Sequence, residues 1–133
     1  MTSKITYLGE LRTSSIHLES GTEILSDAPK DNHGKGAAFS PTDTVANALG
    51  SCMLSIMAIK SKDLNLNLEG STVEITKIMN ADPRRIAKII AVVNLSVVAD
   101  DKCRTILERA AMTCPVFMSL HPDIDKDVTF NWK

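Results

Sequence analysis

The chain has 133 residues, a formal net charge of -1 and 44% apolar residues. This length fits one domain, residues 1–133, with its own hydrophobic core. The balanced charge indicates neither a disordered chain nor a nucleic-acid-binding surface. The N-terminus has no apolar signal segment, and no apolar run approaches the roughly 20 residues of a membrane helix, so we expect a cytoplasmic protein without a membrane span.

Three short β-favouring stretches, at residues 5–8, 14–18 and 22–25, open the chain. Turn-type residues at 19–21 separate the last two stretches, which predicts an antiparallel hairpin or meander. Residues 26–40 are rich in Asp, Pro, Asn and Gly, so we expect a long loop there. Loops of that length inside a compact domain are often functional.

A long helix is predicted from Pro41 to Ser61. Ser40 is a candidate N-cap, Pro41 suits the first helical position, and Asp43 suits the first turn. Apolar residues at spacings of three and four predict a buried stripe. The stripe consists of Val45, Leu49, Cys52, Ile56 and Ile59. Because further Ala and Met residues flank the stripe, we expect a central helix that is buried on most sides.

The second half of the chain predicts two antiparallel strands, at residues 71–79 and 86–99, because both are rich in Val and Ile. Asp100 and Asp101 then begin a second helix, which ends near Cys114-Pro115. A helical turn at 116–120 and a last strand at 128–132 complete the chain. This mixture of strands and helices predicts an α+β fold.

Cys52, Cys103 and Cys114 are an odd number of cysteines in a chain without an export signal, which favours reduced thiols. From the residues alone, Cys52 and Cys114 are either inert core residues or reactive thiols. Cys103 and Cys114 lie roughly 16 Å apart along one predicted helix, too far for a disulfide, so Cys103 is assigned to packing. The histidines and cysteines lack metal-ligand spacing, and we expect neither a metal nor a cofactor.

Three motifs occur together in this order: Ser40-Pro41-Thr42-Asp43, then Ala48-Leu49-Gly50-Ser51-Cys52, and far downstream Cys114-Pro115-Val116. Together they resemble the OsmC/Ohr family of thiol peroxidases over nearly the whole chain. The resemblance implies an OsmC-like α+β fold with antiparallel sheets around a central buried helix, in an intertwined homodimer.

In the peroxidases of that family, one cysteine attacks an organic hydroperoxide and becomes a sulfenic acid, and a second cysteine converts it to a disulfide. A cellular dithiol then restores both thiols. By position, the resemblance makes Cys52 the attacking cysteine and Cys114 the resolving one. An arginine from the N-terminal strands, paired with a glutamate just after the loop proline, assists the attack.

Arg12 is the only arginine in the N-terminal half of the chain. Thr42 stands at the position of the family glutamate, and Asp43 is the nearest carboxylate. The resemblance thus implies a catalytic set of Cys52, Cys114, Arg12 and Asp43. Thr42 also favours an alternative function, in which a protein of this fold binds or senses a small apolar or electrophilic ligand without efficient peroxidase turnover.

Overall fold

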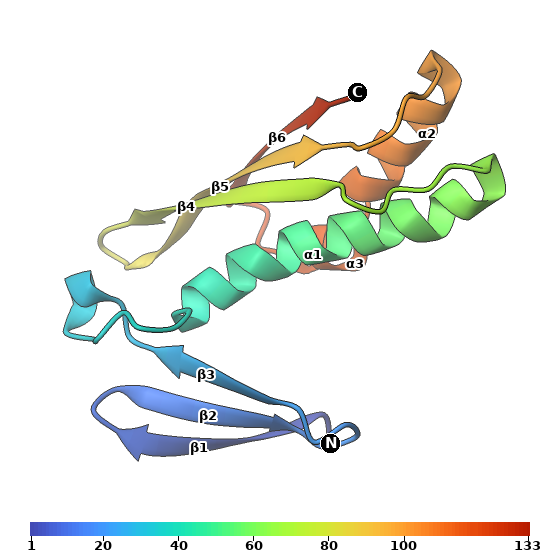
Figure 1. The fold of residues 1–133 in the computed structure, drawn as a ribbon. Helices are drawn as coiled ribbons and strands as arrows, with labels where there is room; N and C mark the ends of the chain where they lie inside the picture. The colour runs from blue at the N-terminus through green and yellow to red at the C-terminus, as the bar shows by residue number, and fades with distance from the viewer. The chain divides into compact units, whose positions relative to one another are not determined.

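The computed structural model describes residues 1–133 and divides into two compact units, residues 1–45 (unit 1) and 46–133 (unit 2). Along the chain, three strands precede the long helix α1, and two strands, two helices and a last strand follow it (Figure 1). Short 3-10 turns lie at Lys30–Asn32 and Lys62–Leu64. The predicted α+β class is confirmed.

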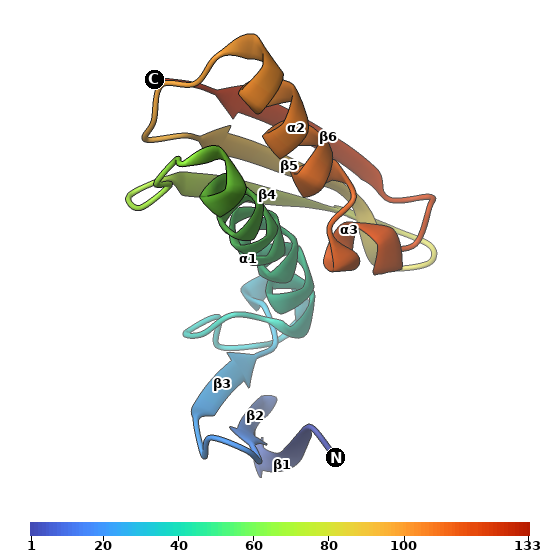
Figure 2. The ribbon, with the colours of Figure 1, turned by 90° about the vertical axis from the view of Figure 1, so that its right-hand side faces the viewer.

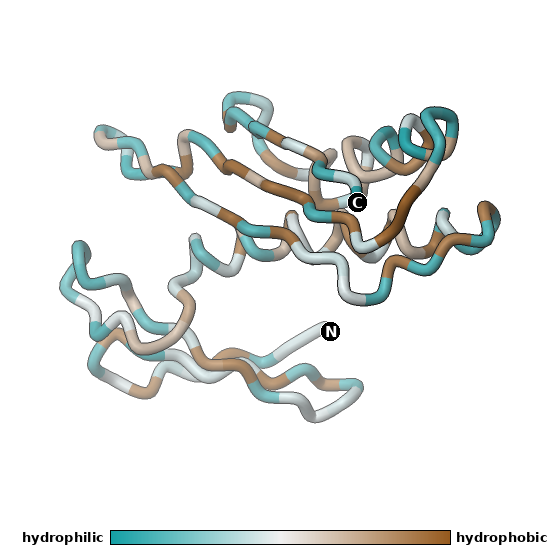
Figure 3. Tube along the Cα trace, turned by 45° about the horizontal axis from the view of Figure 1, so that its top comes forward, coloured by the Kyte–Doolittle hydropathy of each residue, from teal (hydrophilic) through white to brown (hydrophobic).

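Unit 1 contains the predicted meander. Its antiparallel sheet has the order β1 (Ser3–Gly9), β2 (Arg12–His17) and β3 (Glu23–Asp27). The side chains that its strands bury are polar, Ser14 and Asp27. Large apolar side chains stay 43–65% exposed: Ile5, Tyr7, Leu8, Leu11, Leu18, Ile24 and Leu25. Unit 1 therefore leaves much of its apolar surface uncovered within one chain. The brown segments along its strands mark these apolar residues in the sequence (Figure 3).

The helix α1 (Pro41–Ser61) has the predicted bounds. A capping box fixes its start, since the Asp43 N–H donates to Ser40 Oγ and the Ser40 N–H donates to Asp43 Oδ2, each at 3.0 Å. Its buried residues are Ala46, Leu49, Gly50, Met53, Met57 and Ser61. The predicted stripe is therefore wrong at Val45 and Ile59, which are 40% and 63% exposed, whereas Leu49 is buried. Cys52 and Ile56 are half-buried and pack against the core. The helix buries one face within the chain, and not most sides.

By length and composition alone, α1 with the turn that follows it to Leu64 is apolar enough to cross a membrane. The sequence expectation that no apolar run reaches this length is thus incorrect. One such helix is weak evidence, because the core helix of a globular protein meets the same criteria. Here Leu49, Met53 and Met57 have no exposed surface and belong to the hydrophobic core.

Unit 2 is built on a three-stranded sheet of order β4 (Thr72–Asn80), β5 (Arg85–Asn94) and β6 (Asp125–Asn131). The β4 and β5 strands are antiparallel, as the expectation of antiparallel sheets implies, but β5 and β6 are parallel, which corrects that expectation for the last strand. A parallel partner requires a crossover, and α2 (Asp101–Met112) and α3 (Pro115–Ser119) supply it. The β5 strand ends at Asn94, not near residue 99 as expected, because β4 begins opposite it at Thr72.

The helices α1 and α2 cover the same face of this sheet (Figure 2). Gly50 brings α1 close to β4: a Cβ atom at Gly50 would lie 3.1 Å from Ile75 Cδ1 and 3.2 Å from Val73 Cγ1. At the end of the chain, the Trp132 indole N–H donates to Glu108 Oε1 at 2.8 Å. The Arg104 guanidinium lies 5.6 Å from the centroid of the same indole ring. These contacts attach the C-terminus to α2.

Candidate functional site

Two of the three thiols lie in unit 2 where α1 meets the junction of α2 and α3. Cys52 is on α1 and is partly exposed, whereas Cys114 has no exposed surface. Cys114 is the N-cap of α3, and its Sγ accepts a hydrogen bond from the Phe117 N–H at 3.5 Å. Pro115 occupies the first helical position, for which its fixed φ is suited. The Cys-Pro pair thus fixes the place of the buried thiol.

Cys52 and Cys114 interact with each other. Burial raises the pKa of the Cys114 thiol, and the neighbouring Cys52 thiol raises it further as a hydrogen-bonding partner. The N–H groups of Phe117 and Val116 act in the opposite direction. Neither cysteine is in a disulfide. The pair therefore consists of the partly exposed residue Cys52 and, beside it, the buried Cys114, whose raised pKa favours the protonated thiol.

Cys103 has a separate local environment in the first turn of α2. Its N–H donates to the capping side chain Asp100 at 2.8 Å. The hydrogen bond to the Asp100 carboxylate raises the pKa of the Cys103 thiol, and burial raises it further. A negative neighbour disfavours the thiolate, so this cysteine lacks the electropositive surroundings of a reactive thiol.

Arg12, the expected cation, belongs to β2 of unit 1, where it is paired with Asp27 of β3. Arg12 Nε donates to Asp27 Oδ1 at 2.7 Å, and Nη2 donates to Oδ2 at 2.8 Å. The Asp27 carboxylate is buried and also accepts the Ala37 N–H at 3.1 Å. The hydrogen bonds from Arg12 lower the pKa of Asp27 although burial opposes this, and Asp27 in turn raises the pKa of Arg12. The two side chains therefore form a charged, two-pronged pair.

The sequence reasoning missed Asp27 and considered Asp43 for this position. The sequence contains a signal for Asp27, namely its distance from the turn between β2 and β3, because Arg12 and Asp27 are opposite each other in the pairing of these strands. A hairpin that turns at residues 19–21 places them in that register. Asp43, in contrast, lies in the first turn of α1 and shares the capping box with Ser40.

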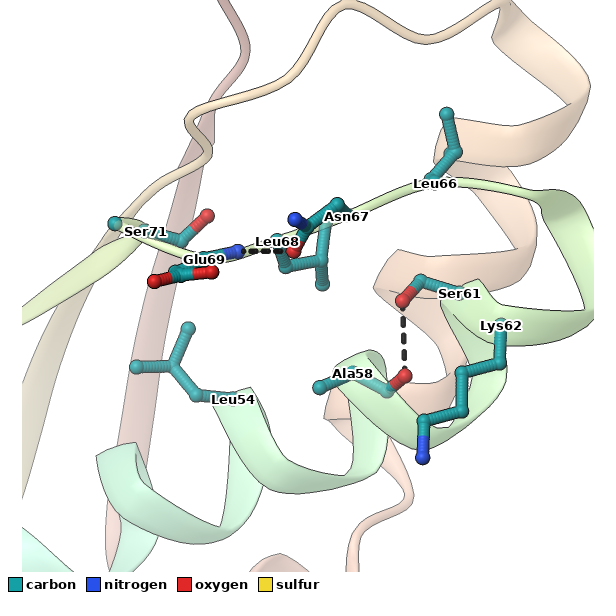
Figure 4. Close-up of a pocket in the computed structure, with 10 residues that line it drawn as sticks. Leu54, Ala58, Ser61, Lys62, Leu66, Asn67, Leu68, Glu69 and Ser71 are labelled. Carbon is teal, nitrogen blue, oxygen red and sulfur yellow. Dashed lines mark hydrogen bonds between the residues drawn. The ribbon is translucent and has the colours of Figure 1, made fainter.

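Each unit also has an apolar hollow. The hollow in unit 2 has a volume of about 490 Å³ and lies between the end of α1 and the segment before β4, where Leu54 and Leu68 face it (Figure 4). The hollow in unit 1 has a volume of about 660 Å³. It is lined by Ile24, Leu25, Gly36, Ala37, Ala38 and Phe39. No group of three or more His, Cys, Asp or Glu side chains is arranged to hold a metal ion.

Comparison with known proteins gives one family. The model of the OsmC-like protein family matches residues 33–129. No curated protein matches the sequence. A solved structure from Psychrobacter arcticus, provisionally assigned as an osmotic stress induced and detoxification response protein, is 50% identical, with a TM-score of 0.95. The match covers 98% of this chain and 96% of that one.

Two more distant structures share the fold. The organic hydroperoxide resistance protein OsmC of Legionella pneumophila has a TM-score of 0.73 at 13% identity, and the match covers 98% of this chain and 97% of that one. An organic hydroperoxide resistance protein of Elizabethkingia anophelis has a TM-score of 0.72 at 17% identity, with 100% and 97% covered. The family model and the close structural relative together show that the chain belongs to the OsmC-like protein family.

Proposed function

We propose that this protein is a thiol-dependent peroxidase that reduces organic hydroperoxides. Membership in the OsmC-like family supports a role in redox chemistry or stress response. The observation that carries the finer proposal is the interacting pair of reduced thiols at Cys52, which is partly exposed, and Cys114, which is buried. A thiol pair of this kind supplies both the nucleophile and the resolving group that hydroperoxide reduction needs.

The reaction has three balanced steps. The Cys52 thiolate attacks the distal oxygen of the hydroperoxide, the O–O bond breaks, and the alkoxide leaves and takes up a proton as an alcohol. Cys114 then attacks the sulfur of the Cys52 sulfenic acid, and its own proton leaves with the hydroxide as water. The resulting disulfide accepts two electrons and two protons from a cellular dithiol, which is itself oxidised to a disulfide.

The proposed roles of Arg12 and Asp43 rest on the family resemblance. Arg12 stabilises the attacking thiolate and the negative charge that develops on the departing oxygen. Asp43 acts through α1, because its capping box fixes the start of the helix that carries Cys52. No metal or bound cofactor takes part in these steps.

We also propose that the protein works as a cytoplasmic homodimer. Unit 1 leaves large apolar side chains of β1 and β3 exposed within one chain, and a second copy is the occupant that the family implies. A reducing compartment fits three free thiols.

A second function is favoured by one observation. The 660 Å³ hollow in unit 1 has the volume of a small-molecule site and is lined by apolar side chains. With Thr42 in place of the family glutamate, the protein would bind or sense a small apolar or electrophilic ligand there, without efficient turnover.

The test is peptide mapping of reduced protein after a stoichiometric addition of cumene hydroperoxide, beside a hydrogen peroxide control. We expect a rapid Cys52–Cys114 disulfide that a dithiol reverses. Cys52→Ser should abolish hydroperoxide consumption, and Cys114→Ser should accumulate a Cys52 sulfenic acid that dimedone traps. Cys103→Ser is the matched control and should react like the wild type. If the wild-type thiols stay reduced, the peroxidase proposal is wrong and the ligand-binding function takes its place.

A further inference from the structure

Asp27 is a buried carboxylate that no sequence motif singled out. It has no exposed surface, and its two oxygens accept three hydrogen bonds: from Arg12 Nε, from Arg12 Nη2 and from the Ala37 N–H. Its own N–H donates to the Phe39 carbonyl at 3.2 Å. Burying a carboxylate costs free energy unless it is paired and hydrogen-bonded. The partners of Asp27 are the Arg12 guanidinium and the backbone of the loop that follows β3.

The loop in question is residues 28–39, and its path is closely fixed within unit 1. The Ala28 N–H donates to the Leu11 carbonyl at 3.0 Å, and the Gly36 N–H donates to the Ala28 carbonyl at 3.3 Å. Gly34 passes so close to Ala28 that a Cβ atom would lie 1.6 Å from its carbonyl oxygen. Lys35 forms an ion pair with Glu10. The loop is therefore held at several points, and Asp27 joins it to Arg12.

An arginine side chain has several rotatable bonds and loses rotamer entropy when one orientation is fixed. The two-pronged pair fixes both the position of the guanidinium and its plane. The Arg12 side chain nevertheless keeps 30% of its surface exposed. Its remaining N–H groups are therefore available to another partner while Asp27 holds the Nε and Nη2 edge.

We propose that Asp27 is the positioning residue of Arg12: its carboxylate fixes the guanidinium in one orientation and joins it to the loop 28–39, so that Arg12 meets the reacting groups already aligned. This inference rests on the proposed peroxidase role of Arg12. Asp27 itself touches neither thiol nor hydroperoxide in this scheme.

The proposal is testable because two roles of Asp27 predict opposite effects on the reactivity of Cys52: one through its negative charge and one through its positioning of Arg12. If Asp27 acted through its charge alone, Asp27→Asn would remove a negative charge beside Arg12, and Cys52 would become more reactive. If it acts by positioning, the same variant lets the guanidinium move, and Cys52 oxidation slows although the local charge has become more positive. The two mechanisms thus predict changes of opposite sign.

The experiment measures the second-order rate of Cys52 oxidation by cumene hydroperoxide and the pH midpoint of Cys52 alkylation by iodoacetamide. For Asp27→Asn we expect a rate loss of roughly 10- to 100-fold, the size that misplacement of a reacting group produces. The alkylation midpoint should rise. Adding Arg12→Lys to Asp27→Asn should cost little more, because both changes remove the same aligned guanidinium.

Two further variants serve as controls. Glu19→Gln removes an exposed carboxylate in the turn between β2 and β3, away from Arg12 and the loop, and should leave rate and midpoint unchanged. Asp27→Glu keeps the charge but shifts the guanidinium by one methylene, so it should also slow oxidation. It tests the proposal even if Asp27→Asn fails to fold, which circular dichroism would reveal.

The outcomes separate the two proposals. A wild type whose Cys52 resists the hydroperoxide overturns the peroxidase function, and the alkylation midpoint then decides the role of Asp27 alone. A wild type that is oxidised rapidly, with Asp27→Asn equally fast or faster, overturns the positioning role and leaves the peroxidase function intact. An unchanged alkylation midpoint in Asp27→Asn also counts against positioning.

Discussion

The ionisation of Asp27 links the stability of the protein to pH. The hydrogen bonds from Arg12 hold the pKa of this carboxyl below its ordinary value, while in the unfolded chain the pKa returns to that value. The unfolded state therefore binds a proton first as the pH falls, which favours unfolding. The stabilisation is fully present above the ordinary aspartate pKa and is lost as the pH falls through the folded-state pKa.

We predict that the difference in the free energy of unfolding between the wild type and Asp27→Asn shrinks as the pH falls from about 5 through the ordinary aspartate pKa of about 3.9 and continues to shrink below it. Urea denaturation at a series of pH values measures this difference. The comparison variant is Glu10→Gln: Lys35 also lowers the pKa of Glu10, but that carboxylate is 77% exposed. The pH dependence should be weaker there. A difference for Asp27→Asn that does not change with pH contradicts this prediction.

Individual residues were predictable from the sequence where a local rule governs them. The helix start is predicted by Ser40, Pro41 and Asp43, and in the structure α1 begins there with a capping box. The partner of Arg12 was not found, because the choice between Asp27 and Asp43 depends on strand register, a long-range property. The turn at residues 19–21 specifies the register between β2 and β3, but only once it is known that these two strands pair with each other.

At the scale of elements, the contact between α1 and β4 depends on Gly50. A glycine inside a helix ordinarily destabilises it relative to alanine. Here the missing Cβ lets the helix approach Ile75 and Val73. Cys52 is two residues further along the same helix, so the depth of α1 against the sheet also sets the position of the thiol.

We predict that Gly50→Val lowers the free energy of unfolding by about 1–3 kcal/mol, because the added methyl groups overpack the helix–sheet contact. Urea denaturation followed by circular dichroism measures the change. Ser51→Val is the matched control, since the neighbouring residue is exposed and should change stability by less than about 0.5 kcal/mol. Equal effects of the two substitutions would show that the contact tolerates a larger side chain.

The elements themselves were largely predictable, but their faces and partners were not. The apolar face of α1 was misassigned because apolar residues occur around most of the helix, so periodicity alone could not separate Val45 and Ile59 from Ala46 and Met53. The last strand was expected, yet its parallel pairing with β5 follows from the crossover through α2 and α3. No local pattern in residues 125–131 specifies a parallel neighbour.

At the scale of the whole molecule, the uncovered apolar surface of unit 1 predicts that stability depends on protein concentration. If a second copy covers this surface, a tenfold increase in concentration should stabilise the dimer by about 1.4 kcal/mol. Sedimentation velocity should give the mass of two chains. A monomer whose denaturation midpoint is independent of concentration contradicts the homodimer.

Ile5→Asp probes the same surface directly. Ile5 is 65% exposed in the single chain, so a charge there should have little effect on a monomer but should dissociate a dimer. Thr6→Asp is the matched control, because adjacent residues of a strand point to opposite faces of the sheet. We expect sedimentation to show monomers for Ile5→Asp and dimers for Thr6→Asp.

The single tyrosine and the single tryptophan of the chain lie in different units. Tyr7 is in β1, and its hydroxyl accepts the Leu11 N–H, whereas Trp132 is held against α2 by Glu108 and Arg104. Each unit therefore carries its own natural fluorophore. Excitation of tryptophan alone follows the unit that carries the thiols, and tyrosine emission follows the unit that carries Arg12, so loss of order in either unit is visible without a label.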